Sequence, residues 1–214
     1  MFLYTEPVPK SSAAGPRWLI PVLVAVVVLA LATFTPRLPG DQAVSRFIQA
    51  MGIGSGPASA VTSLAMQPTI FAVLGVGMLL ATWRGRLRGL VTAAVLILFW
   101  WYAGEPLKTI VQRPRPTADL VEVVRASSGF SFPSTFATAW YSAWLPVAIY
   151  AWRTRQRAAG MAVAIAAGLL ILVGAWARIR MGAHWPSDLL MTLALVWSTF
   201  ALIELAVDRL DSKG

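Results

Sequence analysis

Cysteine is absent from the 214-residue chain, and histidine occurs once, at His184. The lack of cysteine excludes disulfide bonds, thiolate metal ligands and cysteine nucleophiles. One histidine is too few for the common zinc sites, so the sequence predicts no metal and no other cofactor. Charged residues are also scarce, at 13% of the chain, against about 25% in a typical soluble domain. This composition is typical of a membrane protein.

Apolar residues make up 57% of the chain and gather in six segments. Each segment is close to the roughly 20 residues that a helix needs to cross about 30 Å of hydrocarbon. The runs are too long, and alternate too little, to be the strands of a membrane barrel. We therefore predict an all-α, polytopic membrane protein with six transmembrane helices in one bundle. The predicted spans are residues 18–35, 60–83, 90–110, 133–152, 158–177 and 189–207, in a single membrane domain of residues 1–214 with tails at 1–17 and 208–214.

Positive charges predict the orientation of this bundle. The net charge is +9, and arginines cluster in short connections between apolar segments. Because cytoplasmic loops are enriched in Lys and Arg, both tails are predicted to be cytoplasmic and the connections after the first, third and fifth spans to face outward from the inner membrane. The charge is expected to meet anionic lipid headgroups, because no motif points to nucleic acid. The sequence indicates no oligomeric state. The cations behind this prediction are Lys10, Arg17, Arg84, Arg86, Arg88, Arg153, Arg155, Arg157, Arg209 and Lys213.

Residues 40–56 differ from the spans. Their apolar side chains fall at Val44, Phe47, Ile48 and Met51. This spacing predicts a short amphipathic helix that lies in the membrane interface and serves mainly for packing.

Two of the outward connections collect ionisable residues, which are costly near a membrane and are therefore functional candidates. Cations around a single imidazole would bind a multiply charged anion such as phosphate and would lower the pKa of the imidazole. If a helix begins near residues 186–187, Asp188 can accept a hydrogen bond from Nδ1 of His184 and leave Nε2 free to attack phosphorus. A lone histidine is more often a cap or packing residue, so this interpretation depends on both clusters sharing one face. The clusters are Lys108, Arg113 and Arg115, and Arg178, Arg180, His184 and Asp188.

The spacing of these residues resembles the type 2 phosphatidic acid phosphatase superfamily of integral-membrane lipid phosphate phosphatases. The first part of that family's signature is matched by Lys108 and Arg115-Pro116, and its third part by Arg178, His184 and Asp188. The resemblance implies that Lys108, Arg115 and Arg178 hold the phosphate, that His184 is the nucleophile and that Asp188 orients it. The family's known substrates are phosphatidate, phosphatidylglycerol phosphate, isoprenyl phosphates and diphosphates, and lipid A phosphates.

The chain departs from the family in the middle signature, Pro-Ser-Gly-His. Pro133 and Ser134 are kept, but Thr135 replaces the glycine and Phe136 replaces the histidine that acts as general acid in the family. The Ser134 hydroxyl and the Thr135 backbone N–H are still expected to bind phosphate near a helix N-terminus. A general acid typically contributes about 10²–10⁴-fold, and its loss matters most for an alkoxide leaving group.

Three interpretations of Phe136 stay open: a natural relative with lost or changed activity, an enzyme for diphosphates, and an engineered replacement. A phosphate group that leaves from a diphosphate needs no added proton, because the second pKa of a phosphate group is about 6 and the group is a stable anion at neutral pH. Asp119 and Glu122 are other candidate proton donors.

The sequence thus predicts an outward-facing lipid phosphatase that works through phospho-His184, with an isoprenyl diphosphate such as undecaprenyl diphosphate as the favoured substrate. The alternative is an impaired relative that binds or carries a lipid phosphate without efficient hydrolysis. A small transporter would predict corresponding helix breaks in two halves of the chain, and no such symmetry is visible.

Overall fold

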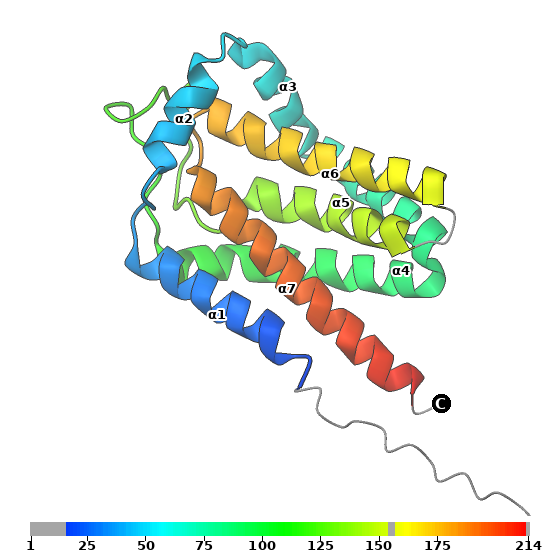
Figure 1. Cartoon of the computed structure of the whole chain (residues 1–214). Coiled ribbons are helices and arrows are strands. Elements are labelled where there is room, and N and C mark those ends of the chain that lie inside the picture. Colours follow the sequence, from blue (N-terminus) through cyan, green and yellow to red (C-terminus); the bar gives the residue numbers. More distant parts are fainter. Residues whose placement is uncertain (1–15, 154–156, 213–214) are drawn as a thin grey trace, which may run out of the picture.

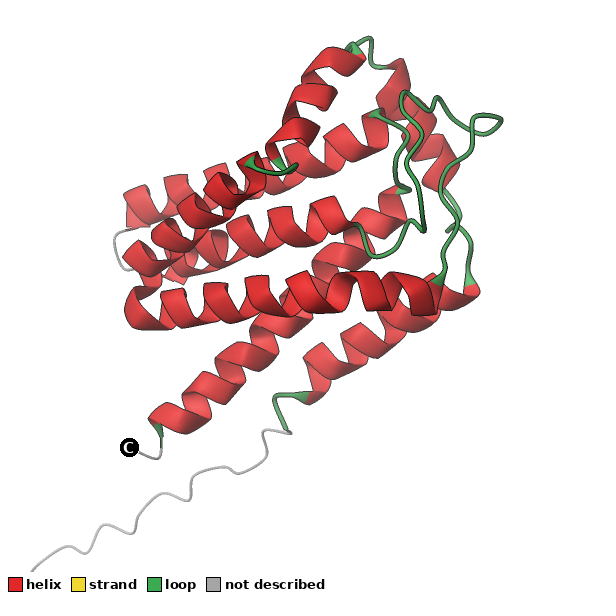
Figure 2. Ribbon diagram, turned by 180° about the vertical axis from the view of Figure 1, so that it is seen from behind, coloured by secondary structure: helices red, strands yellow, loops and turns green. Residues whose placement is uncertain are grey.

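The computed structural model describes residues 16–153 and 157–212. Every regular element within these ranges is an α-helix (Figures 1 and 2), which confirms the predicted all-α fold. Lys10, Arg155 and Lys213, three of the cations behind the predicted orientation, lie outside the described residues. The helices are α1 (Leu19–Phe34), α2 (Asp41–Ala50), α3 (Ser55–Leu64), α4 (Thr69–Val111), α5 (Thr135–Arg153), α6 (Arg157–Arg180) and α7 (Pro186–Asp211).

Helix α4 contains most of the second predicted span and all of the third. Its 43 residues are interrupted at Arg86, whose φ of 55° and ψ of −143° are not helical. A Cβ atom at Gly89 would overlap the carbonyl oxygen of Ala81, so the two halves of α4 come into direct contact just after this turn. Glycine is required there because any side chain would separate the halves.

The second predicted span differs from the structure at its start. Residues 60–83 were predicted as one helix, but α3 ends at Leu64 and α4 begins at Thr69. Among the described residues, three helices are long and apolar enough to cross a membrane, namely α4, residues 158–180 of α6, and α7, while α1 is apolar but shorter. The count of six spans stays a prediction.

Helix α5 forms the centre of the bundle. Its aromatic side chains at Phe136, Trp140, Tyr141 and Trp144 are all buried, because α5 packs against α4, α6 and α7. Burial on several sides explains why its apolar residues do not follow a single stripe. Helix α1 packs mainly against α7, and the start of α1 and the end of α7 lie at the same end of the bundle (Figure 1).

Most of the loops gather at the opposite end of the bundle, beside α2 and α3 (Figure 2). The predicted amphipathic helix is present there as α2. Gln49 of α2 donates to the carbonyl oxygen of Glu122 at 2.7 Å and accepts from its backbone N–H at 3.1 Å. Arg46 donates to the carbonyl oxygen of Leu120 at 2.9 Å. Helix α2 therefore holds the long connection between α4 and α5 over the end of the bundle.

Candidate active site

His184 lies in the short connection between α6 and α7, and its side chain is only 2% exposed. Helix α7 begins at Pro186, so the helix start that the sequence argument assumed is present, three residues before the predicted span. Proline suits this position because the N–H groups of a first helical turn have no partner within the helix. Gly182 precedes the histidine with a φ of 66°. The chain therefore turns tightly here and directs the imidazole into the end of the bundle.

The Nε2 atom of His184 faces two polar side chains from distant parts of the chain. The hydroxyl of Ser134 lies 3.1 Å away and Nη1 of Arg115 lies 3.3 Å away. Ser134 also accepts a hydrogen bond from the N–H of Ala137 at 3.2 Å, so it caps α5. Because a guanidinium can only donate, this arrangement favours a lone pair on Nε2 and the proton on Nδ1.

Asp188 lies beside Nδ1 of His184, with Oδ2 at 3.7 Å. This distance exceeds that of a hydrogen bond, and Nδ1 has no other partner among the described residues. The carboxylate is held from other directions. The N–H of Trp185 donates to Oδ2 at 2.8 Å, and Nη1 of Arg113 lies 2.5 Å from Oδ1. The predicted proximity is present, but not the direct hydrogen bond.

Burial is the main reason why the pKa of His184 is lowered from 6.5 to about 4. The positive charges of Arg178 and Arg115 lower it further, whereas Asp188 raises it. The sequence argument named the cations as the cause, but desolvation is the larger effect. The imidazole is therefore neutral at pH 7, as a nucleophile must be.

Arg113 and Asp41 form a buried support beneath the histidine that was not predicted from the sequence. The guanidinium of Arg113 is fully buried and donates to Asp188, to the hydroxyl of Ser187 at 2.9 Å and to the carbonyl oxygen of Thr35 at 3.0 Å. Asp41 accepts hydrogen bonds from both the N–H and the hydroxyl of Ser187 at 2.9 and 2.5 Å. These contacts join α1, α2, α7 and the connection after α4.

Lys108 lies in a second polar group with Thr135 and Glu105. Its ammonium group donates to the Thr135 hydroxyl and lies 3.0 Å from Oε1 of Glu105. The Thr135 hydroxyl donates to the same carboxylate oxygen at 3.0 Å. Glu105 was missed in the sequence analysis, although its position three residues before Lys108 on one helix face is the spacing of an ion pair.

Arg178 lies against Phe136, the residue at the position where the family described above has a histidine. Its guanidinium carbon is 5.3 Å from the centre of the Phe136 ring, within the range of a cation–π interaction. Phe136 also stacks on Trp140, with ring centres 5.5 Å apart. Nε of Arg178 is buried and has no hydrogen-bond partner among the described residues, and the Arg178 side chain lines the cavity described next.

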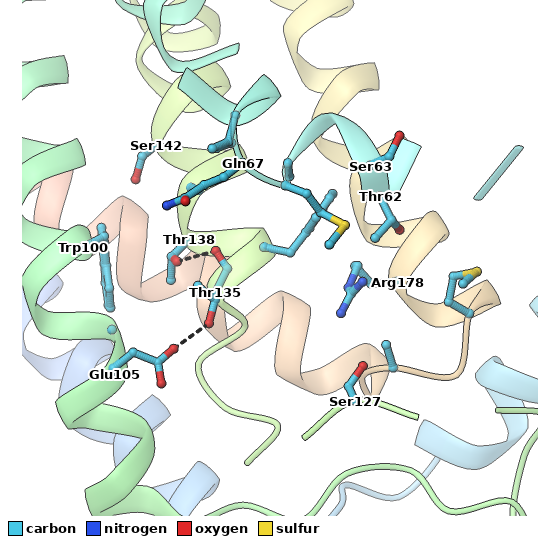
Figure 3. Close-up of a pocket in the computed structure, with 18 of the residues that line it drawn as sticks. Thr62, Ser63, Gln67, Trp100, Glu105, Ser127, Thr135, Thr138, Ser142 and Arg178 are labelled. Atoms are coloured by element: carbon cyan, nitrogen blue, oxygen red, sulfur yellow. Dashed lines mark hydrogen bonds between the residues drawn. The ribbon is translucent and has the colours of Figure 1, made fainter. Parts of the chain in front are cut away.

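A cavity of about 810 Å³ lies beside these groups. Figure 3 shows Glu105 and Thr135 on one side of it and Arg178 on the other. The apolar part of the cavity wall includes Phe136, Trp100 and Leu74, and Arg125 contributes another positive charge. The mixed lining suits a ligand with an anionic head and an apolar tail.

The structure thus brings the predicted residues into three contacting groups: His184 with Ser134, Arg115 and Asp188; Lys108 with Thr135; and Arg178 with Phe136. The two candidate proton donors lie elsewhere. Glu122 pairs with Arg180 at 3.0 Å, and Asp119 is exposed in the loop. Within the described residues, no group of three or more His, Asp or Glu side chains could hold a metal ion.

Comparison with known proteins identifies the family. The chain is similar to the first transmembrane PAP2 type phosphatidylglycerolphosphate phosphatase from Bacillus subtilis, with a TM-score of 0.68 and 17% identity over 90% of this chain and 96% of that chain. No curated protein matches. The profile of the PAP2 superfamily matches residues 89–210, which is more than half of the chain. The chain therefore belongs to the PAP2 superfamily, which confirms the resemblance seen in its motifs and supports phosphatase activity in an integral membrane protein.

Proposed function

We propose that this protein is a membrane lipid phosphatase that hydrolyses a lipid phosphate or diphosphate through a phospho-histidine at His184. The main support is the environment of Nε2, which carries a lone pair and lies 3.3 Å from Arg115 and 3.1 Å from Ser134. A phosphate bound by the arginine would be held next to the nucleophile. Lys108 and Arg178 would add positive charge, and the Thr135 N–H lies in the first turn of α5, where anions are favoured.

The proposed reaction has two displacements at phosphorus. In the first, the lone pair of Nε2 forms a bond to phosphorus while the bond to the leaving oxygen breaks. In the second, water attacks phospho-His184, the P–N bond breaks and inorganic phosphate is released. Arg115, Lys108 and Arg178 would stabilise charge on the phosphoryl oxygens, the main catalytic requirement in phosphoryl transfer.

Phe136 supports a diphosphate as the preferred substrate, because its ring cannot protonate a leaving alkoxide. A leaving phosphate departs as a stable anion, so isoprenyl diphosphates such as undecaprenyl diphosphate fit this site better than phosphate monoesters. We place the site on the outer face of the membrane, with both tails in the cytoplasm, on the distribution of arginines. The lipid tail would then enter from the outer leaflet.

Phosphate release by the purified protein tests this proposal. Undecaprenyl diphosphate should be hydrolysed faster than phosphatidylglycerol phosphate, the monoester named for the Bacillus protein. The variant Phe136→His should raise monoester turnover by about 10²–10⁴-fold, because it restores a proton donor. Equal rates on both substrates, with no gain in the variant, would contradict the leaving-group argument.

The presence of Phe136 where the family has a histidine also supports a second function. In this function the protein binds or carries a lipid phosphate without efficient hydrolysis. No phosphate release from either substrate, together with saturable binding of both lipids, would support this second function and reject the first.

A further inference from the structure

The second half of the proposed reaction needs a base, and Phe136 cannot provide one. Water is a poor nucleophile, and its attack on phospho-His184 is accelerated when a nearby group accepts its proton. In the family, a histidine occupies position 136. The ring of Phe136 instead contacts Arg178 and Trp140. The following inference rests on the proposed function and concerns which side chain activates the water.

Glu105 has the right exposure and hydrogen bonding for this role. Its side chain is 69% exposed and lines the cavity, so water can reach it. Oε1 is fixed by Lys108 and by the Thr135 hydroxyl at 3.0 Å. Oε2 forms no hydrogen bond with the described residues. Figure 3 shows one oxygen of this carboxylate hydrogen-bonded to Thr135.

The carboxylate is connected to the nucleophile through two consecutive residues, Thr135 and Ser134. Thr135, its hydrogen-bond partner, directly follows Ser134, whose hydroxyl lies 3.1 Å from Nε2 of His184. Arg115, which contacts the same Nε2 atom, lies near enough to Glu105 for the two charges to interact. The cavity that would hold a water molecule on Oε2 is lined by Thr135 and Ala183, the sequence neighbours of Ser134 and His184.

The charged groups near this carboxylate, among the described residues, are cations. Lys108 pairs with it from the same helix, and Arg115 approaches from the connection after α4. Arg178 of α6 and Arg125 of the long connection line the same cavity. Neighbouring positive charge favours the ionised form of a carboxyl group, which is the form that accepts a proton.

We propose that Glu105 is the general base for hydrolysis of phospho-His184. As water oxygen bonds to phosphorus, a water proton moves to Oε2 of Glu105. The P–N bond breaks and its electron pair returns to Nε2 of His184. Inorganic phosphate leaves, and Glu105 then releases its proton to solvent.

This role links Glu105 to the substrate class. An ionised carboxylate can take a proton from water in the second step, but it has none to give to a leaving alkoxide in the first. The site is then complete for a diphosphate and incomplete for a monoester.

Rapid-mixing kinetics of Glu105→Gln on undecaprenyl diphosphate tests the inference. The variant should release about one equivalent of undecaprenyl phosphate per protein in a fast burst, then turn over about 10²–10⁴-fold more slowly than the unaltered chain. Phosphate should accumulate on His184, detectable as an acid-labile, base-stable phosphoprotein. The matched control is Asp119→Asn, which removes one carboxylate charge from an exposed loop position and should leave the kinetics unchanged.

The burst counts intact sites, so a folding defect cannot imitate this result. Glu105→Gln with unaltered turnover, or with slow turnover and no trapped phosphoprotein, would reject the role of Glu105. Activity that persists in His184→Ala would instead reject the proposed function, so the two failures are distinguishable.

Discussion

Two buried polar clusters lie at opposite ends of the bundle, and they differ in how completely they are paired. The cluster around Glu204 of α7 is closed. Tyr150 and Thr92 donate to Oε1 at 2.6 and 3.1 Å, Arg88 lies 3.2 Å from Oε1, and Arg153 lies 2.6 Å from Oε2. Both carboxylate oxygens are satisfied, so this cluster ties α4, α5 and α7 together.

The cluster around His184 is open. Nδ1 of His184 and Nε of Arg178 are buried without partners among the described residues. Arg178 and Ala183, the residue before His184, line a large cavity. Buried polar groups without partners are costly, so a folded protein keeps few of them. The contrast agrees with the proposed function, in which the Glu204 end serves stability and the His184 end would bind a ligand.

The largest effect is expected on activity, when the proposed nucleophile His184 is removed from the open cluster. His184→Ala should lower phosphate release from undecaprenyl diphosphate by at least about 10³-fold, because it removes the side chain that forms the proposed phosphorylated intermediate. Tyr150→Phe removes one hydroxyl from the closed cluster and should lower stability while the activity per folded molecule is kept. If His184→Ala keeps its activity, or Tyr150→Phe loses it at full folding, the assignment of the two ends is wrong.

A smaller effect is expected on stability when one arginine is removed from each cluster. Arg113→Met leaves Asp188 buried without its closest cation and should cost about 3–5 kcal/mol of unfolding free energy. Arg153→Gln should cost no more than about 1 kcal/mol, because the Arg153 side chain is 54% exposed. Reversible unfolding in mixed detergent micelles measures both, and equal costs would show that burial does not separate the two clusters.

The smallest effect concerns the protonation of the only histidine. The NMR signals of isotopically labelled His184 should titrate with a pKa of about 4, not with the usual value of 6.5. Because the folded state resists protonation, stability should fall as the pH drops from about 6.5 towards about 4. A titration midpoint near 6.5 would show that water reaches the imidazole, contrary to its burial.

The parts of the site that could be predicted from sequence are those that short spacings specify. Lys108 and Arg115, and likewise Arg178, His184 and Asp188, stand at fixed intervals in two short motifs. The helical character followed from the long apolar segments. The count of six spans stays a prediction, and the break between α3 and α4 was missed because residues 60–83 are apolar on both sides of it.

The roles of Arg113 and Asp41 beneath His184 could not be predicted from short motifs, because their partners are far away in the sequence. Arg113 and Asp188 are 75 residues apart, and Asp41 and Ser187 are 146 residues apart. These pairs are brought together by the packing of α2 and of the connection after α4 against the start of α7. Glu105 was overlooked for another reason: a carboxylate is unexpected among phosphate-binding cations, and its partner Thr135 lies on a different helix.

Arg115 carries a consequence for how tightly an anion can be held. Its Nε atom donates to the carbonyl oxygen of Gly129 at 2.9 Å and its Nη1 atom to that of Ala183 at 2.7 Å, while Nη2 forms no hydrogen bond with the described residues. The side chain is thus immobilised during folding, and little rotamer entropy remains to be lost when a phosphoryl oxygen arrives. A lysine could not make these contacts together, so in the proposed function this guanidinium would be ordered before the phosphate binds.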